Sequence, residues 1–262
     1  MTASTLDVRS LFDVAGRRAL VTGASRGIGL RLAESLAAAG CEVTIVARSP
    51  QPLERARVQV MAGTGARVHA VAFDATQSDQ VAAGVTSAVE AMGGLDIVVN
   101  NAGVQFRAAV TEFPDDQWHR LLETNVSTAF FVSREAAKVM IPQAAGKIVN
   151  ICSVQSELAR PAIAPYSATK GALKMLTRGL CADLGPYGIQ VNGLAPGYVD
   201  TELTAALVAD DEFSAWIARR TPAGRWGQVD DLVGTLLFLS SRASDFVNGQ
   251  IVYVDGGMTS VL

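Results

Sequence analysis

The sequence of 262 residues contains few of the residues that form disulfide bridges or bind metal ions, with 3 cysteines and 2 histidines. Cys41, Cys152 and Cys181 lie far apart and form no Cys-x-x-Cys pair, which argues against a disulfide framework and against a structural zinc site. His69 and His119 are isolated as well, so no metal site is predicted. We expect free, buried thiols, as is typical of proteins in a reducing cytoplasm.

Long apolar runs and an excess of basic residues are also missing. No segment reaches the roughly 18 apolar residues that a membrane-spanning helix requires, and the N-terminal stretch lacks the apolar run of a signal peptide. The net charge is -3 and the arginines and lysines are scattered, which argues against binding to nucleic acid or to an anionic membrane. These absences favour a cytoplasmic protein that acts on a small molecule.

Apolar residues, by contrast, make up 49% of the chain, which is enough for a substantial core in a single domain over residues 1–262. Short runs rich in valine and isoleucine, such as "DIVVN" and "KIVNI", alternate with segments of helical periodicity. Because near-continuous apolar runs are typical of strands covered on both faces, the sequence predicts an α/β fold with a doubly wound parallel sheet of the Rossmann type. Helices are expected over 28–39, 53–62, 79–92, 115–140, 165–184 and 229–240.

Two regions depart from this alternation. Residues 1–14 are interpreted as an N-terminal tail. Residues 197–227 contain Tyr198, Trp216 and Trp226 but no strand pattern, and so long a connection in a compact domain often covers a functional site. We therefore predict a substrate lid over residues 197–227.

The first predicted strand runs into "VTGASRGIGL", where Gly23, Gly27 and Gly29 open a helix. Glycine lets the backbone come close to a phosphate, and the free amides at the helix N-terminus can then bind it. The spacing differs from the Gly-x-Gly-x-x-Gly of the commonest dinucleotide fingerprint. A tight strand-to-helix turn without a ligand is therefore the alternative.

The end of the second predicted strand indicates which dinucleotide would bind. An NAD site usually has an acidic residue about 20 residues after the glycines, but this sequence has Ala47 followed by Arg48 and Ser49. Together with Arg26 from the glycine loop, these residues would surround the 2'-phosphate of NADP with two guanidinium groups and a hydroxyl. The sequence predicts NADP(H) as the cofactor, unless both arginines are simply solvated.

Tyr166 and Lys170 in "APYSATKGAL" are one helical turn apart and share a face of a predicted helix. Pro165 suits the first position of that helix, so the phenol lies near its positive end. An ammonium group about 4 Å away would contribute roughly 4 kcal/mol at an effective dielectric constant of about 20, which would make the phenol a much stronger acid. Such a phenol can exchange a proton with a carbonyl or alcohol oxygen, although this spacing also occurs by chance on many helices.

Other polar residues are expected near this pair. Ser153 follows the fifth predicted strand at the carboxyl edge of the sheet, where ligands of such folds bind, and its hydroxyl would hold the substrate oxygen. Asn125 lies in a long predicted helix, and is either a satisfied core amide or the holder of a water that relays protons to Lys170. The "NNAG" segment at 100–103 follows the fourth strand and would place small residues against the nucleotide.

Taken together, these residues resemble the short-chain dehydrogenase/reductase family. The shared motifs are TGxxxGxG at Thr22, Gly23, Gly27 and Gly29, NNAG at 100–103, the Asn-Ser-Tyr-Lys set at Asn125, Ser153, Tyr166 and Lys170, and the Pro-Gly turn at Pro196 and Gly197. The resemblance extends from about Leu11 to Gly257. It implies a seven-stranded parallel sheet and a homotetramer in which the helices around 115–140 and 165–184 pair between subunits.

The resemblance also implies a role for each matching residue. Tyr166 would be the general acid/base, and Lys170 would bind the nicotinamide ribose and make the phenol more acidic. Ser153 would hold the reacting oxygen and Asn125 the relay water, while Val199 would bond the carboxamide, Thr201 the phosphates and Asp74 the adenine. The set expected to contact NADP(H) is Gly23, Ser25, Arg26, Gly27, Ile28, Gly29, Arg48, Ser49, Asp74, Ala75, Asn101, Ala102, Gly103, Tyr166, Lys170, Pro196, Gly197, Val199 and Thr201.

Within the family, the stretches "RTPAGRWGQ" and "SSRASDFVNGQ" are similar to those of members that interconvert gluconate and 5-ketogluconate with NADP. The site would then receive a polyhydroxy carboxylate. Arg107 and Arg160 are candidates for neutralising its carboxylate, and Gln105, Gln155 and Glu157 for bonding its hydroxyls. Each of the five is equally compatible with a structural or surface role.

Other functions stay open at this stage. A 3-oxoacyl carrier-protein reductase commonly continues NNAG with a Thr-Arg/Lys-Asp run, whereas this chain has "VQFRAA"; a keto-sugar or tropinone-type ketone reductase is also compatible. A non-catalytic dinucleotide sensor would be expected to lack Tyr166 or Lys170, and both are present. A serine hydrolase would need a histidine base, and neither histidine lies near the Ser153 segment.

Overall fold

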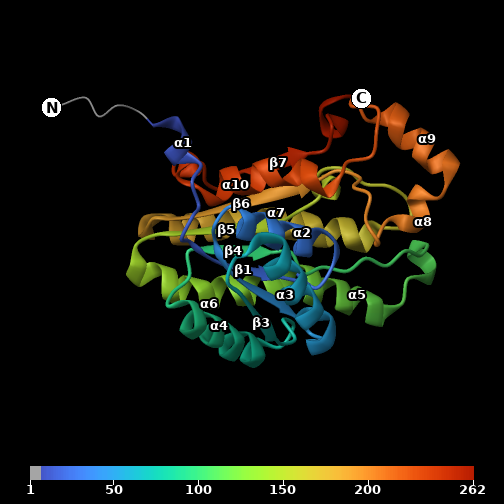
Figure 1. Cartoon of the computed structure of the whole chain (residues 1–262). Helices are drawn as coiled ribbons and strands as arrows, with labels where there is room; N and C mark the ends of the chain where they lie inside the picture. Colours follow the sequence, from blue (N-terminus) through green and yellow to red (C-terminus); the bar gives the residue numbers. More distant parts are fainter. Residues whose placement is uncertain (1–6) are drawn as a thin grey trace.

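The computed structural model describes residues 7–262, which form one seven-stranded sheet with helices on both faces (Figure 1). Neighbouring strands are all parallel, in the order β3-β2-β1-β4-β5-β6-β7. This confirms the doubly wound α/β fold that the sequence predicts. The strands are β1 (Arg18–Thr22), β2 (Glu42–Ala47), β3 (Val68–Ala72), β4 (Ile97–Asn100), β5 (Gly146–Ile151), β6 (Ile189–Pro196) and β7 (Ile251–Val254).

The helices lie on the two faces of the sheet because each directs an apolar stripe towards it. On one face α2, α3 and α10 bury residues such as Leu32 and Leu53 in a common cluster, and on the other α4, α6 and α7 bury Val85 and Met140. The α-helices are α1 (Val8–Leu11), α2 (Gly27–Ala38), α3 (Pro50–Thr64), α4 (Ser78–Met92), α5 (Asp115–Leu122), α6 (Thr128–Gln143), α7 (Ala164–Leu184), α8 (Ala205–Val208), α9 (Asp211–Arg220) and α10 (Val233–Ser240).

The structure departs from the predicted elements at two places. The short helix α1 lies within the predicted tail 1–14, of which residues 1–6 are outside the described part. The single helix predicted over 115–140 is divided, because a π-helical turn, η2 (Glu123–Ser127), joins α5 to α6. Such turns are rare and often occur at functional sites.

Residues 197–227 contain α8 and α9 but no regular strand, as predicted. Their two ends meet in an isolated parallel bridge between Val199 and Gly227, and Figure 1 shows α8 and α9 projecting together beyond one end of the sheet.

Across residues 7–262, no helix is both long enough and apolar enough to span a bilayer.

The order of the strands reverses between β1 and β4. From β1 the chain proceeds outward to β2 and β3, and it then crosses to the other side of β1 to form β4 and the rest of the sheet. In open α/β sheets this switch point leaves a crevice at the carboxyl ends of the strands, where ligands bind. The topology therefore predicts a ligand site at the carboxyl ends of β1, β2, β4 and β5.

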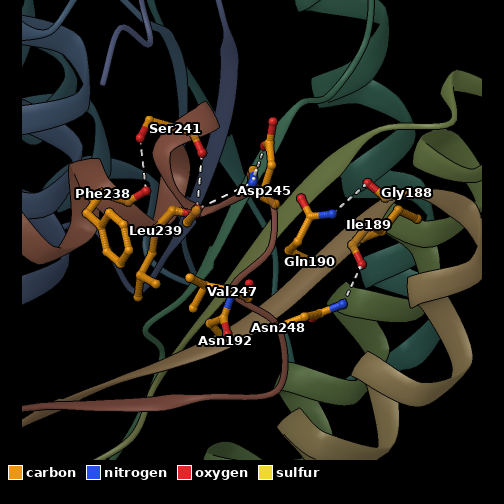
Figure 2. A network of polar contacts seen from close by, with 12 residues as sticks. Gly188, Ile189, Gln190, Asn192, Phe238, Leu239, Ser241, Asp245, Val247 and Asn248 are labelled. Atoms are coloured by element: carbon orange, nitrogen blue, oxygen red, sulfur yellow. Dashed lines mark hydrogen bonds and ion pairs between the residues drawn. The ribbon is translucent and has the colours of Figure 1, made fainter. Parts of the chain in front are cut away.

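The opposite, amino end of the sheet is held by polar contacts (Figure 2). Lys147, at the start of β5, donates from Nζ to Asp245 Oδ1 at 2.8 Å. Asn192 Nδ2 donates to the carbonyl oxygen of Val247 at 2.7 Å, and the side chain of Asn248 donates to the carbonyl oxygen of Ile189 at 3.4 Å. These contacts attach the loop before β7 to β5 and β6. The polar groups named here are therefore used for contacts within the protein.

Candidate active site

A cavity of about 720 Å³ opens at the carboxyl ends of the strands around the switch point. This volume falls in the range of ligand and cofactor sites in proteins, roughly 300–1,000 Å³. Most of the predicted cofactor and catalytic residues line it. They are Gly23, Ser25, Arg26, Gly27, Ile28, Arg48, Ser49, Asp74, Ala75, Asn101, Ala102, Gly103, Ser153, Tyr166, Lys170, Pro196 and Thr201.

The three glycines of the first loop differ in what they make possible. Gly27 has φ +57 and nothing within 4 Å of where a Cβ would be, so its backbone is open to the cavity. At Gly29 a Cβ would lie 2.3 Å from Asn101 Nδ2. Gly29 therefore serves the packing of α2 against the turn after β4, and it does not line the cavity.

Asn101 locks the two cofactor loops together. Its Nδ2 donates to the carbonyl oxygens of Thr22 at 3.0 Å and Gly23 at 3.1 Å, and its backbone N donates to Thr22 Oγ1 at 3.0 Å. These contacts span 78 and 79 residues of sequence, and through them the glycine loop and the NNAG turn form one rigid wall of the cavity.

One end of the cavity carries positive charge. Arg48 and Ser49 follow β2 directly and are exposed, and Arg26 extends from the glycine loop with its side chain 79% exposed. Arg26 has a distant carboxylate partner, Glu202 at 4.0 Å, and in residues 7–262 Arg48 forms no ion pair. Two guanidinium groups with little compensation suit a phosphate better than a ribose diol alone.

Tyr166, Lys170 and Ser153 come together at the other end. Lys170 is 6% exposed, and its Nζ donates to the carbonyl oxygen of Ile151 at 2.7 Å and lies 5.8 Å from the centroid of the Tyr166 ring. Among residues 7–262 no carboxylate pairs with this ammonium. Ser153 Oγ accepts from the backbone N of Gln155 at 3.1 Å, so its proton is free to point into the cavity.

Asn125 lies in the π-helical turn, and its side chain is fully hydrogen bonded. Its Oδ1 accepts from Val104 N at 2.8 Å, and its Nδ2 donates to Val104 O and to Thr169 Oγ1, both at 3.0 Å. The amide therefore connects the loop after β4 to the helix that carries Tyr166. The satisfied-amide interpretation is confirmed for the side chain, and the relay water stays a prediction.

The five predicted substrate residues lie outside the lining of the main cavity. Gln155 is buried and its Oε1 accepts from Ser167 Oγ at 3.5 Å, and Glu157 pairs with Lys174 and accepts from the Tyr253 hydroxyl at 3.1 Å. Gln105 makes a long contact of 3.4 Å with Arg107 Nη2. Two of the predicted cofactor residues, Gly197 and Val199, are also absent from the lining of the main cavity. They line a separate cavity of about 250 Å³.

Arg107 and Arg160 approach each other across two loops. Burial raises the pKa of the Tyr198 phenol, and the positive charges of Arg160 and Arg107 oppose this rise. Burial and the charge of Arg160 also lower the pKa of Arg107 from its ordinary value. Both guanidinium groups are therefore close enough to the same phenol, and to each other, to interact electrostatically.

The sequence interpretation missed a buried polar network behind the site. Asn100 Nδ2 donates to Asn150 Oδ1 at 2.8 Å and to Ser133 Oγ at 2.9 Å, and Asn150 Nδ2 donates to Thr177 Oγ1 at 2.9 Å. Asn100 and Asn150 are register partners in β4 and β5. The available signal was an asparagine near the end of each of two apolar strands, where an isolated amide would be costly without a partner.

The chain is similar in sequence to several known proteins. Residues 23–259 match the family model described as Enoyl-(Acyl carrier protein) reductase. The chain is 56% identical over 249 residues to Gluconate 5-dehydrogenase of Gluconobacter oxydans, covering 95% of this chain and 97% of the relative. It is 45% identical to 5-keto-D-gluconate 5-reductase of Escherichia coli, covering 96% of this chain and 98% of the relative.

Solved structures agree with these matches. A gluconate 5-dehydrogenase from Burkholderia cenocepacia, in complex with NADP and tartrate, is 52% identical and superposes with a TM-score of 0.93, covering 97% of this chain and 99% of that one. The glycine loop, the NNAG turn and the Tyr166–Lys170 pair thus lie in a chain whose fold and whole sequence match those of these proteins. The chain belongs to the short-chain dehydrogenase/reductase family.

Proposed function

We propose that this protein interconverts D-gluconate and 5-keto-D-gluconate with NADP(H). The observation that supports this most directly is the placement of Tyr166, Lys170 and Ser153 at the edge of a dinucleotide-sized cavity. Arg107 and Arg160, on the neighbouring loops, form no ion pair within residues 7–262. The names of the relatives from Gluconobacter oxydans and Escherichia coli point to the same reaction.

The residues of the cavity fit NADP(H). Backbone amides from Gly23 to Gly29 would bind the pyrophosphate at the N-terminus of α2, and Arg26, Arg48 and Ser49 would bind the 2'-phosphate. Asp74 and Ala75 would contact the adenine, and the NNAG turn the adjoining ribose. Pro196, Gly197, Val199 and Thr201 would hold the nicotinamide half and its phosphates. When bound, NADPH supplies the hydride that reduces the ketone.

The protein's own residues then handle the proton. Tyr166 would donate its phenol proton to the carbonyl oxygen at C5 during reduction and remove it from the alcohol in the reverse direction. Ser153 would donate a hydrogen bond to the same oxygen, and Lys170 would bind the nicotinamide ribose while its charge stabilises the phenolate left behind. Asn125 would hold the relay water and keep the Val104 loop against α7.

The substrate would lie between these groups and the lid, residues 197–227. Arg107 and Arg160 would face its carboxylate, and Gln105, Gln155 and Glu157 are the proposed partners of its hydroxyls. Glu157 and Gln155 have protein partners already, so their contribution to substrate binding requires those contacts to rearrange.

The function can be tested with a panel of 5-ketogluconate, neutral keto sugars and a 3-oxoacyl thioester, each assayed with NADPH by its loss of absorbance. We expect turnover of 5-ketogluconate with the highest kcat/KM. Good turnover of the thioester without turnover of 5-ketogluconate would overturn the proposal in favour of an acyl carrier-protein reductase.

We also propose that the protein is a cytoplasmic homotetramer. Support comes from exposed apolar residues on the helices expected to pair, Phe130 on α6 and Met175 on α7, and from three free cysteines. Sedimentation equilibrium should give four times the mass of one chain, and substituting Met175 with glutamate should shift the distribution towards smaller species.

A further inference from the structure

Four aromatic rings form a box beside Arg160. Tyr198, in the loop after β6, packs edge to face on Phe213 at 5.6 Å, on Trp216 at 6.1 Å and on Trp226 at 5.8 Å between ring centroids. The indole of Trp226 also donates from Nε1 to Ser214 Oγ at 3.0 Å. These four residues, called the aromatic box below, bind helix α9 to the loop that carries Tyr198, because edge-to-face ring pairs stabilise a fold beyond the area that they bury.

Arg160 rests against this box. Its guanidinium carbon lies 5.7 Å from the centroid of Phe213, which is the ring that Tyr198 also contacts. The guanidinium opposes the rise that burial causes in the pKa of the Tyr198 phenol, and within residues 7–262 Arg160 Nε is buried without a hydrogen-bond partner. A buried donor left in this state destabilises the protein unless a ligand accepts from it.

Arg107 completes the arrangement from the neighbouring loop. Ala108 N donates to the carbonyl oxygen of Ala162 at 3.2 Å, so the segments that carry Arg107 and Arg160 are joined by a backbone hydrogen bond. Ala162 has φ 66, in the left-handed region that alanine rarely adopts. Strain of this kind is tolerated where the surroundings fix the backbone, often at a binding site.

The two arginines have no acidic partner to compensate their charges. In residues 7–262 neither takes part in an ion pair, and the charge of Arg160 makes protonation of Arg107 less favourable. Two like charges on adjoining segments repel each other until an anion is bound between them. The Tyr198 ring contacts Phe213, the ring against which Arg160 packs, so the Tyr198 hydroxyl is a neutral polar group on the same aromatic cluster.

We propose that Tyr198 is a positioning residue for the carboxylate of the substrate. Its hydroxyl orients Arg160 against Phe213, so that Arg160 and Arg107 together select anionic polyhydroxy ketones over neutral ones. The identity of that anion as a sugar acid rests on the proposed function, whereas the orientation of Arg160 by Tyr198 does not. Helix α9 contributes through the aromatic box, which fixes the ring of Tyr198.

The first experiment compares Tyr198→Phe with the wild type, because phenylalanine keeps the ring contacts and removes only the hydroxyl. We expect KM for 5-ketogluconate to rise about 10-fold, the effect of losing one hydrogen bond to a charged group, with kcat within about twofold. KM for fructose, a neutral ketone of the same carbon number, and KM for NADPH should not change. An equal rise for fructose, or no rise for the keto acid, would overturn the proposal.

A double-mutant cycle separates positioning from a merely structural role. Arg160→Gln should raise KM for the keto acid at least as much as Tyr198→Phe, and the double variant should be no worse than Arg160→Gln alone. If the two effects instead multiply, Tyr198 does not act through Arg160 and the proposal fails. Melting temperatures of all variants identify any that lose activity through unfolding.

A binding measurement distinguishes failure of this proposal from failure of the proposed function. Tartrate is titrated into the NADP-bound protein with the intrinsic tryptophan fluorescence as the signal, to which Trp216 and Trp226 contribute together with Trp118, and threitol serves as its uncharged analogue. Weaker tartrate binding by Tyr198→Phe, with threitol unaffected, supports the proposal even if 5-ketogluconate is not turned over. Turnover of 5-ketogluconate combined with unchanged tartrate binding refutes it while the proposed function stands.

Discussion

The two ends of the sheet treat buried lysines in opposite ways. At the amino end Lys147 is 3% exposed and donates to Asp245 Oδ1 at 2.8 Å and to Ser244 Oγ at 3.3 Å. At the carboxyl end Lys170, equally buried, donates to a single carbonyl oxygen and has no carboxylate partner in the described chain. A buried ammonium that the protein neutralises supports the fold, and one that it leaves to a main-chain oxygen is available to a ligand.

The arginines show the same contrast. Arg18, at the start of β1, binds Asp96 through Nε at 2.7 Å and Nη2 at 2.8 Å. Although burial alone would raise the pKa of Asp96, the hydrogen bonds from Arg18 hold it below its ordinary value. In the described part of the chain, Arg107 and Arg160 at the other end have no such acid. The contrast can be tested by removing groups from each end and recording whether activity or stability changes.

Tyr166→Phe should have the largest effect. It removes the transferable proton and little else, so kcat should fall about 10³-fold, while the Kd for NADPH and the melting temperature stay near the wild-type values. Steady-state kinetics and a fluorescence titration with NADPH measure the two. Retention of full turnover would show that the phenol is not the acid.

Arg48→Ala should come next. Loss of one charged contact to the 2'-phosphate should lower kcat/KM for NADPH about 10- to 100-fold and leave kcat/KM for NADH unchanged. Arg57→Ala is the matched control, because Arg57 lies on the adjacent helix α3 and its guanidinium binds Glu54. If both variants lose kcat/KM for NADPH to the same extent, the effect comes from the overall charge, and Arg48 does not bind the 2'-phosphate.

Substitutions at the amino end should change stability and leave kinetics alone. Asp245→Asn leaves the buried Lys147 charge unpaired and should destabilise the protein by about 2 kcal/mol. Lys147→Met should cost less, because the Asp245 side chain is 59% exposed and stays hydrated when alone. Urea unfolding gives both values, and a larger loss for Lys147→Met would contradict this order.

The pH dependence at this end has a definite sign. Burial lowers the pKa of Lys147, and Asp245 only partly offsets it. Because the unfolded chain then binds the proton more tightly, the stability of the wild type relative to Lys147→Met should rise as pH increases from about 7 to 10. A constant difference across this range would show that Lys147 titrates normally.

The smallest effect concerns Cys152, next to Ser153. Burial raises the pKa of this thiol to about 11, although the charge of Lys170 opposes the rise. At neutral pH the thiol should therefore react with iodoacetamide far more slowly than an exposed cysteine. Peptide mass mapping should find Cys152 unlabelled in the native protein and labelled in urea; rapid native labelling at neutral pH would contradict the assignment.

Much of this architecture was predictable from local patterns. The apolar runs predicted the strands, and the helix over 165–184 predicted the shared face of Tyr166 and Lys170. The glycine at 40, which ends α2 with φ 91, was also predictable because a left-handed turn favours glycine there.

What could not be predicted depends on partners distant in sequence. Asn101 is held by hydrogen bonds to Thr22 and Gly23 in another loop. Asn150 finds its partner Asn100 only when β5 is aligned with β4. The π-helical turn leaves no signal in helical periodicity. Whether Gln155 and Glu157 reach a substrate depends on Ser167, Lys174 and Tyr253, whose approach the sequence does not specify.

The lock between Gly29 and Asn101 has a consequence for how such an enzyme can change over generations. A side chain at position 29 would collide with that amide at 2.3 Å, so a substitution at Gly29 requires the Asn101 amide, and with it the NNAG turn, to move. The region from 197 to 227 is restrained differently, by packing of Ile217 against Val154 and Met258 and of Tyr198 against the other aromatic rings. New keto acid preferences are therefore most easily engineered by changing side chains in the part of that segment beyond Thr201, while the glycine loop and the NNAG turn stay unaltered.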